Sequence, residues 1–359
     1  MRIAFVAPLV TAIAEPQLGG SQALLADIAS GLVARGHDVT VFAASGSRID
    51  GVRTIDTGVQ APTLASALFR AADEEDEQDD SVQTREAFAR VYALVDEVSF
   101  DLVHNHAFDV PAIELAPADV PVVHTLHLPP RQRIAAAVDV SRARSRSVTV
   151  AAVSRFGAAS WERLVHVDVV LPNGVPVDRI AFSMDGGGGA LYAGRLSPEK
   201  GAAEAIEIAH RAMVPITVAG APYDESYAAE RIEPQRSGTV EIVGALPRAE
   251  LWRLMGRSRV VLCPALWDEP FGLVAAEAQA AGTPVIAYAR GALGEVVRDG
   301  QTGAVVEDIA GAVQALGGIG TIERGACRRH AQRHLDLART LDAHEALYAR
   351  LATRNVSPT

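Results

Sequence analysis

Two groups of charged residues in the second half of the chain have types and spacing suited to binding a diphosphate. Arg195 and Lys200 lie in residues 194–201, Gly-Arg-Leu-Ser-Pro-Glu-Lys-Gly, directly after a predicted strand. Ser197 suits a helix N-cap and Pro198 the first helical position, so both cations would emerge where a helix start attracts anions. Arg offers a planar fork of donors and Lys a point charge. The pattern favours a diphosphate site, although a solvated, Lys-bearing helix start has the same features.

The second group combines two carboxylates with the start of another helix. Residues 269–277 read Glu-Pro-Phe-Gly-Leu-Val-Ala-Ala-Glu. Gly272 lets backbone approach a ligand closely, and a helix beginning near Leu273 would present free N–H groups. Glu277 lies about one turn inside an otherwise apolar helix, where an ionised carboxylate is costly without a partner. We therefore expect a ligand hydroxyl or a cation beside Glu277; a structural salt bridge at the helix edge is the alternative.

Short β-branched strands alternate with Ala-rich amphipathic helices along the chain, which predicts βαβ units and parallel sheets. With 359 residues, the chain exceeds the size at which one hydrophobic core stops growing. The expected fold is α/β with two doubly wound, Rossmann-like domains: residues 1–172, a hinge or linker at 173–189, and 190–337. The predicted strands are 2–7, 38–43, 102–105, 122–126, 148–153, 168–171, 190–193, 216–219, 240–243, 260–263 and 285–287, and the clearest predicted helices are 21–35, 85–98 and 340–351.

Together, the two charged motifs resemble the donor-site motifs of glycosyltransferase family 4, retaining enzymes with the GT-B fold. The second motif is similar to the family's pair of glutamates separated by seven residues. The resemblance extends through Gly19-Gly20 and residues 100–104, 172–175 and 282–285. It implies two parallel sheets facing a central cleft, with a last helix, 338–359, packing back on the first domain. It also implies transfer of a hexosyl unit from a UDP- or GDP-type nucleotide sugar to an acceptor hydroxyl, with no metal or other cofactor.

The resemblance further implies a role for each matching residue. Arg195 and Lys200 would bind the diphosphate of the donor, Glu277 the ribose, and Glu269 hydroxyls of the transferred sugar. His127 would be the histidine of the acceptor domain, contacting the sugar or steering the acceptor; with Glu269, Arg195 and Lys200 it completes the expected catalytic set. The remaining expected donor-site residues are Gly19, Gly20, Gly194, Val243, Gly244, Leu246, Phe271, Gly272, Leu273 and Val274, and those on the acceptor side are Gln22 and His106.

Four histidines end two neighbouring predicted strands: His104 and His106 one, His124 and His127 the other. Residues two apart on a strand share a face, so His104 and His106 could chelate a metal. No Asp, Glu or Cys flanks them, and we expect no metal site. Packing is the alternative role for His104 and His124. Gln22 is ambiguous as well, because a polar residue in the first turn of a helix needs no function.

Composition restricts the partners. A net charge of −11 argues against a general nucleic-acid binder, which needs a basic face. The two cysteines have neither the spacing of a metal site nor that of a disulfide framework, and no apolar stretch approaches the ~20 residues of a membrane span. Pro8 interrupts an N-terminal run that otherwise imitates a signal peptide. We therefore expect a cytoplasmic protein. Residues Arg131–Arg146 form a basic stretch that predicts either a weak peripheral membrane contact or, without aromatic anchors, a solvated helix face. The acidic run Asp73–Asp80 is expected to be a solvated loop.

Two other classes of function fit parts of the pattern. A glycoside hydrolase would use two carboxylates across a glycosidic bond. A non-catalytic nucleotide-sugar-binding protein would keep the donor site alone. The absence of a G-x-G-x-x-G pattern argues against a nicotinamide enzyme. The identity of the acceptor, the base and sugar of the donor and the oligomeric state cannot be predicted from the sequence.

Overall fold

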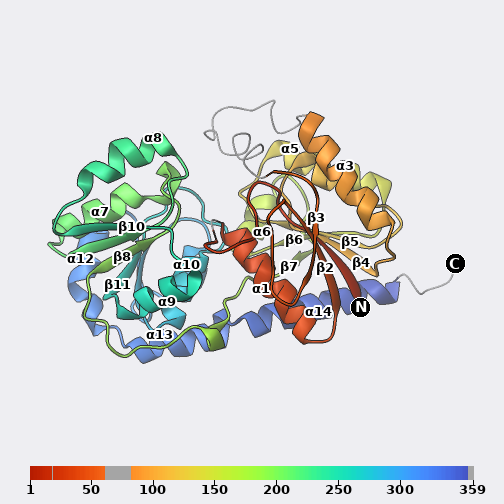
Figure 1. Ribbon diagram of the computed structural model, residues 1–359. Coiled ribbons are helices and arrows are strands. Elements are labelled where there is room, and N and C mark those ends of the chain that lie inside the picture. The colour runs from red at the N-terminus through yellow and green to blue at the C-terminus, as the bar shows by residue number, and fades with distance from the viewer. Residues whose placement is uncertain (18, 61–81, 355–359) are drawn as a thin grey trace. The chain divides into compact units, whose positions relative to one another are not determined.

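The computed structural model describes residues 1–17, 19–60 and 82–354 (Figure 1). The chain divides into two compact units, residues 1–172 with 340–359, and residues 173–339. Residues 173–189, expected to form a linker, group with the second unit. The acidic run Asp73–Asp80 lies outside the described residues. Within those residues, no helix is long and apolar enough to cross a membrane.

The first unit contains a parallel sheet whose seven described strands have the order β3-β2-β1-β4-β5-β6-β7. Its strands are β1 (Arg2–Val6), β2 (Asp38–Ala43), β3 (Arg53–Asp56), β4 (Leu102–Asn105), β5 (Val122–Leu126), β6 (Val148–Ala152) and β7 (Val169–Val170). Its helices are α1 (Gly20–Ala34), α3 (Val82–Asp96), α4 (Val110–Glu114), α5 (Gln132–Arg144), α6 (Arg155–Trp161) and α14 (Leu337–Arg354), the last beginning just before the boundary of the unit.

Successive side chains of each strand point to opposite faces of this sheet, and each face packs against its own layer of helices. Ala4 and Val6 of β1 lie in a core cluster with Phe88 of α3. Phe5, between them in sequence, points to the other face, where its ring contacts that of His104 on β4 (ring centroids 5.4 Å apart). His104 in turn contacts Tyr348 of α14. Because both faces are covered, the central strands are buried along almost their full length.

The second unit contains a parallel sheet whose six described strands have the order β10-β9-β8-β11-β12-β13. Its strands are β8 (Ala190–Ala193), β9 (Ile216–Ala219), β10 (Val240–Gly244), β11 (Val260–Cys263), β12 (Val285–Tyr288) and β13 (Gly303–Val306). Its helices are η2 (Val177–Arg179), η3 (Pro198–Lys200), α7 (Ala202–Arg211), α8 (Glu225–Tyr227), η4 (Ala228–Ile232), η5 (Glu233–Gln235), α9 (Arg248–Arg257), α10 (Leu273–Ala280), α11 (Leu293–Val296), α12 (Ile309–Gly318), η6 (Ile319–Thr321), α13 (Arg324–His330) and η7 (Ala331–Leu335).

Each sheet reverses its strand order once, and the reversal determines where a ligand can bind. In the second unit the chain builds outward from β8 to β10, then returns to place β11 on the other side of β8. In the first unit, β4 returns to the other side of β1 in the same way. Ligands of doubly wound sheets bind beyond the carboxyl ends of the strands at such a switch point.

The predicted α/β class with two doubly wound parallel sheets is confirmed. Two strands, β3 and β13, were not predicted, and both lie at the edge of their sheet. One predicted strand, 168–171, was too long, because only Val169 and Val170 pair with β6. The last helix spans Leu337–Arg354, so it begins three residues before the predicted 340–351 and one residue before the 338–359 that the resemblance implied.

Candidate functional site

Both predicted donor motifs leave the second sheet at its switch point. Strand β8 ends at Ala193, immediately before the first motif, and β11 ends at Cys263, six residues before the second. The two strands are parallel neighbours, with Leu191 opposite Val261. Their carboxyl ends therefore lie at the same edge of the sheet, which brings the two motifs together.

The first motif forms a strand–loop–helix junction, as predicted, but its helix begins in two steps. Pro198–Lys200 form the 3-10 turn η3, and α7 begins at Ala202 after Gly201. Ser197 occupies the N-cap position of η3, yet its hydroxyl does not cap backbone N–H groups; it donates to Glu199 Oε1 (2.7 Å). The predicted N-cap position of Ser197 is confirmed, and its hydroxyl bonds to the neighbouring carboxylate instead of to backbone N–H groups.

Arg195 is held by two side chains of the second unit. Its guanidinium lies 3.4 Å from Glu199 and over the ring of Tyr223, 4.6 Å from the ring centroid. The Arg195 side chain is 19% exposed. Stacking on an aromatic face restricts a long cationic side chain. Glu199 and Tyr223 therefore limit where the Arg195 guanidinium can lie.

Lys200 and Glu269 form a salt bridge that joins the two motifs. Lys200 Nζ lies 2.7 Å from Glu269 Oε2, and the two side chains are 20% and 18% exposed. The indole N–H of Trp267 donates to the same oxygen (2.9 Å), and Lys200 Nζ lies 4.3 Å from the centroid of its ring. An ammonium has three donors, so the bond to Glu269 leaves two for another acceptor. Trp267 was not among the predicted site residues.

The second motif turns sharply into α10, which begins at Leu273 as predicted. Gly272 has φ +98°, and a Cβ at this position would lie 2.7 Å from Leu293 Cδ2. Only glycine fits there, because L-residues rarely adopt this conformation and the space is filled. The N–H groups of Leu273 and Val274 lie in the first turn of α10, where backbone N–H groups have no acceptor inside the helix.

Glu277 is 6% exposed and forms a salt bridge with an arginine of the same unit, which is the structural salt bridge named as the alternative; a cation was also among the expected partners. Arg248 NH2 donates to Glu277 Oε1 at 2.9 Å, and Nε of the same guanidinium lies 3.3 Å from that oxygen. Arg248 is the first residue of α9 and lies over the ring of Trp252 (4.8 Å). Sequence reasoning missed Arg248, because its partner is 29 residues away and no local pattern joins them. The one signal in the sequence was that Glu277 lies in an otherwise apolar helix, where a carboxylate needs a partner.

The segment expected near the nucleotide base follows β10. Val243 and Gly244 end the strand, whose register to β9 shifts between Ile242 and Gly244. Gly244 has φ +72°, and its carbonyl accepts from Gly220 (2.8 Å). Leu246 comes two residues later, in the turn before α9. The structure thus places Val243, Gly244 and Leu246 on the β10 side of the switch point.

In the first unit, the predicted histidines form a buried stack. His106 Nδ1 and His127 Nε2 are 3.0 Å apart, and the rings of His104 and His106 stack with centroids 4.0 Å apart. Burial lowers the pKa of His127 to about 4, and it lowers the pKa of His106 well below the ordinary value, as does the neighbouring His127. At neutral pH these imidazoles are therefore uncharged hydrogen-bonding groups.

His104 and His124 have structural partners, as their packing alternative required. His104 bonds to Tyr348 and to Thr125, each at 2.6 Å. His124 bonds to Asn105 (3.1 Å) and Ser141 (3.0 Å). In the described part of the chain, no group of three or more His, Cys, Asp or Glu side chains is arranged to hold a metal ion.

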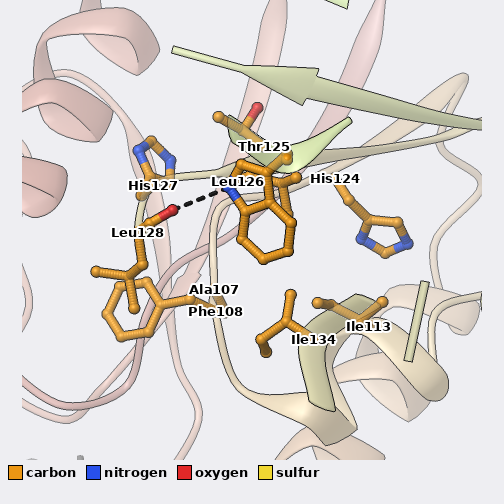
Figure 2. A pocket seen from close by; sticks show the side chains of 10 residues that line it. Ala107, Phe108, Ile113, His124, Thr125, Leu126, His127, Leu128 and Ile134 are labelled. Carbon is orange, nitrogen blue, oxygen red and sulfur yellow. Dashed lines mark hydrogen bonds between the residues drawn. The ribbon is translucent and has the colours of Figure 1, made fainter. Parts of the chain in front are cut away.

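His127 also lines a small cavity with mostly apolar walls (Figure 2). The cavity measures about 10 Å³, which is about the space of one water molecule. Phe108 and Trp161 contribute to its walls, and the Trp161 indole donates to the carbonyl of Leu128 (3.0 Å), drawn as the dashed line in Figure 2. His106 Nε2 is buried, and among the described residues it has no hydrogen-bond partner.

Two further predicted features of the first unit are placed as follows. Helix α1 begins at Gly20 with Gly19 as its N-cap, so the Gly19-Gly20 pair opens a helix after β1, as expected. Gln22 is 3% exposed, and its side-chain oxygen accepts from the hydroxyl of Ser21 (2.9 Å). This bond is a local role for Gln22 and requires no ligand.

The basic stretch Arg131–Arg146 comprises helix α5 and the residues at its two ends. Two of its members are used within the unit: Arg142 donates to Asp168 (2.6 Å) and to the carbonyl of His166 (2.9 Å), and Arg144 donates to the carbonyl of Glu114. These bonds favour the interpretation as a helix face over a membrane contact.

Comparison with known proteins identifies the family. Residues 185–316 match the model described as Glycosyl transferases group 1, and residues 18–179 match Glycosyltransferase Family 4. The chain is 30% identical over 373 residues to a D-inositol 3-phosphate glycosyltransferase of Rhodococcus erythropolis, an alignment that covers 88% of this chain and 83% of the relative. The chain belongs to glycosyltransferase family 4. The predicted family and its class of enzyme are confirmed.

Two further matches place this family 4 member among its relatives. A glycogen synthase of Mycobacterium tuberculosis is 33% identical over 249 residues, which cover 60% of this chain; the chain spans 59% of that relative's length. The Anabaena protein Alr3699/HepE, solved in complex with UDP-glucose, has a TM-score of 0.75 at 18% identity and covers 97% of this chain and 100% of its own. The second match shows the shared GT-B fold.

Each of the two family models covers a different group of the predicted site residues of this family 4 chain. The group 1 model covers both donor motifs, from Arg195 to Glu277, and also Arg248. The family 4 model covers the Gly19-Gly20 pair and the histidine stack with His127.

Proposed function

We propose that this chain transfers a hexosyl unit from a UDP- or GDP-type nucleotide sugar to an acceptor hydroxyl, with retention of the anomeric configuration and without a metal ion. One observation carries the proposal: two cations, Arg195 and Lys200, and the first turn of α10 lie at the edge of the sheet where β8 and β11 end. The complex of Alr3699/HepE with UDP-glucose supports a UDP-type donor.

The chemistry follows from the charge that develops on the leaving diphosphate. Arg195, Lys200 and the N–H groups of Leu273 and Val274 would stabilise that charge as the sugar–phosphate bond breaks. Preorganised electrostatic stabilisation of this kind usually contributes more to catalysis than any other single effect. Both cations are paired with carboxylates in the structure, Arg195 with Glu199 and Lys200 with Glu269, so the proposal requires them to turn toward the diphosphate when the donor binds.

The two carboxylates are proposed to position the donor. Glu277 would accept from ribose hydroxyls, and Glu269 would accept from hydroxyls of the transferred sugar. Both form salt bridges in the structure, at 2.9 Å to Arg248 and 2.7 Å to Lys200. The proposal gives the proton of the acceptor hydroxyl to the departing phosphate oxygen.

The other predicted residues have lesser roles in this proposal. The backbone of Gly194 and of Phe271–Val274 would line the sugar and phosphate, and Val243, Gly244 and Leu246 would line the base. Gly19 and Gly20 would bind the distal phosphate or the acceptor, while His127, with His106 and Gln22, would orient the acceptor as neutral hydrogen-bonding groups.

Calorimetry and product analysis test the proposal. UDP or GDP should bind the chain in buffer containing EDTA, and the product formed from UDP-glucose or GDP-mannose should keep the anomeric configuration of the donor, as measured by NMR. Absence of binding by both nucleotides, or an inverted product, would refute it. A requirement for added Mg²⁺ or Mn²⁺ would refute the metal-independent form.

Substitution of the cations tests their role in turnover. Arg195→Ala and Lys200→Ala should each lower turnover by about 10²–10³, by analogy with loss of one oxyanion donor. Arg211→Ala is the matched control: it lies on the adjacent helix α7 and pairs with Glu207 at an exposed position. Normal turnover in well-folded Arg195→Ala and Lys200→Ala proteins would contradict the assignment.

A further inference from the structure

Trp267 contacts both charged partners that join the two donor motifs. Its indole N–H donates to Glu269 Oε2 at 2.9 Å. Its ring face lies under Lys200, whose Nζ is 4.3 Å from the ring centroid and 2.7 Å from the same Oε2. One partly buried side chain therefore contacts the carboxylate with its edge and the ammonium with its face.

The two bonds to a single oxygen determine the orientation of the carboxylate. The terminal torsion of a glutamate is broad, so a carboxylate bonded to one donor can rotate. Here the ammonium of Lys200 and the indole of Trp267 bond to the same Oε2. Among the residues that the structure describes, none donates to Oε1 of Glu269. Oε1 is thus the oxygen left for an outside donor, such as a sugar hydroxyl.

Of these two donors, only Trp267 is suited to hold Glu269 throughout donor binding. Lys200 is the cation expected to bind the diphosphate, and an ammonium that moves toward phosphate weakens its bond to Glu269. The indole N–H is neutral and belongs to a rigid ring two residues away in the chain, so the phosphate attracts it far less than it attracts the ammonium. Its bond to Oε2 can persist when Lys200 changes partners.

We propose that Trp267 is a positioning residue whose indole N–H holds Glu269 so that Oε1 accepts from the transferred sugar. Trp267 thereby determines how much tighter the site binds a nucleotide sugar than the corresponding nucleoside diphosphate. This inference rests on the proposed function of the donor site and adds to it a residue that acts on the sugar part alone.

The test compares two ligands on the full chain with Trp267→Phe, which keeps an aromatic face for Lys200 but removes the N–H donor together with the five-membered part of the indole. Calorimetry should show the Kd of UDP-glucose, or of GDP-mannose if that donor binds wild type more tightly, raised about tenfold, equivalent to about 1.4 kcal/mol. The Kd of UDP or GDP should change less than twofold, and this binding also shows that the variant is folded. An equal change for both ligands, or no change for the nucleotide sugar, would overturn the inference.

A double-mutant cycle distinguishes positioning from direct contact or general packing. In a Glu269→Gln background, Trp267→Phe should change the Kd of the nucleotide sugar less than twofold further. A second tenfold loss there would show that Trp267 acts independently of Glu269 and would overturn the proposal. Leu266→Ala, at the exposed neighbouring position, is the control for the loop and should leave both Kd values unchanged; the same selective loss in this variant would also count against a specific role of Trp267.

The outcomes separate this inference from the proposed function. If wild type binds neither nucleotide sugars nor nucleoside diphosphates, the proposed function fails, and with it the inference. If wild type binds both and Trp267→Phe is indistinguishable from it, only the role of Trp267 is refuted.

Discussion

Removing Arg248 should destabilise the second unit strongly, because it would leave the carboxylate of Glu277 buried without its cation. The two side chains are 11% and 7% exposed and 2.9 Å apart. Breaking a buried pair from one side typically costs about 3–5 kcal/mol. Loss of the contact with Trp252, 4.8 Å from the guanidinium, adds about 0.5–1 kcal/mol. We therefore expect Arg248→Met to lower the free energy of unfolding by about 4 kcal/mol.

Urea unfolding followed by tryptophan fluorescence measures this loss. With a typical slope of about 2 kcal/mol per molar urea, the midpoint should fall by roughly 2 M. The double variant Arg248→Met/Glu277→Gln should recover at least about 2 kcal/mol, since it removes the uncompensated charge. Arg211→Met is the control for an exposed pair, with side chains 56% and 42% exposed, and should cost less than about 1 kcal/mol.

The reasoning would be refuted if Arg248→Met cost no more than Arg211→Met. It would also be refuted if adding Glu277→Gln brought no recovery, because the cost would then come from packing alone and not from a buried charge.

Two further predictions concern Glu269 and the histidine stack. Gly291 has φ +60°, and a Cβ there would lie 2.2 Å from the carbonyl oxygen of Glu269, so Gly291→Ala should lower the free energy of unfolding by about 1–3 kcal/mol and lower donor turnover at least tenfold. Gly300→Ala, also at positive φ but in open space, should lower stability only. Equal turnover in the two variants, measured as donor consumption, would contradict this prediction. His344 of α14 extends the histidine stack, with its ring centroid 5.5 Å from that of His104. Burial lowers the pKa of His127 and of His344 to about 4, against about 6.5 in an unfolded chain, so the unfolded state binds more protons between these values. Stability therefore falls as the pH drops through this window, by about 2 kcal/mol per histidine at pH 5 relative to pH 7.5. Thermal unfolding at the two pH values should show a lower midpoint at pH 5, with a smaller drop in His344→Gln; an unchanged midpoint would argue against buried neutral imidazoles.

The features that could be predicted are those that depend on a short, continuous segment of the sequence. Runs of β-branched residues located all but two of the described strands, because a buried parallel strand needs an almost continuous apolar run. The two that were missed, β3 and β13, are edge strands whose residues are only partly buried, so their sequences carry less of this signal. The start of α10 at Leu273 was also predictable, because Gly272 marks a turn that other residues cannot make.

The contacts that complete the candidate site could not be predicted, because they join residues far apart in the chain. Glu277 clearly needed a partner, yet only the packing of α9 beside α10 shows that Arg248 is that partner. Trp267 was visible next to the second motif, but its bond to Glu269 depends on how the loop after β11 folds. In the first unit, His104 bonds to Tyr348 across 244 residues of sequence.

The division of the chain into its two units has a consequence for biosynthesis. Helix α14 supplies Tyr348 and Leu341 to the interior of the first unit, although it follows the whole second unit in the sequence. The second unit is a single uninterrupted segment that ends at residue 339. A nascent chain therefore has all the residues of its second unit before those of its first. Until α14 has left the ribosome, the sheet surface around Phe5 and His104 lacks its covering helix, so the first unit cannot complete its core before the second unit has been synthesised.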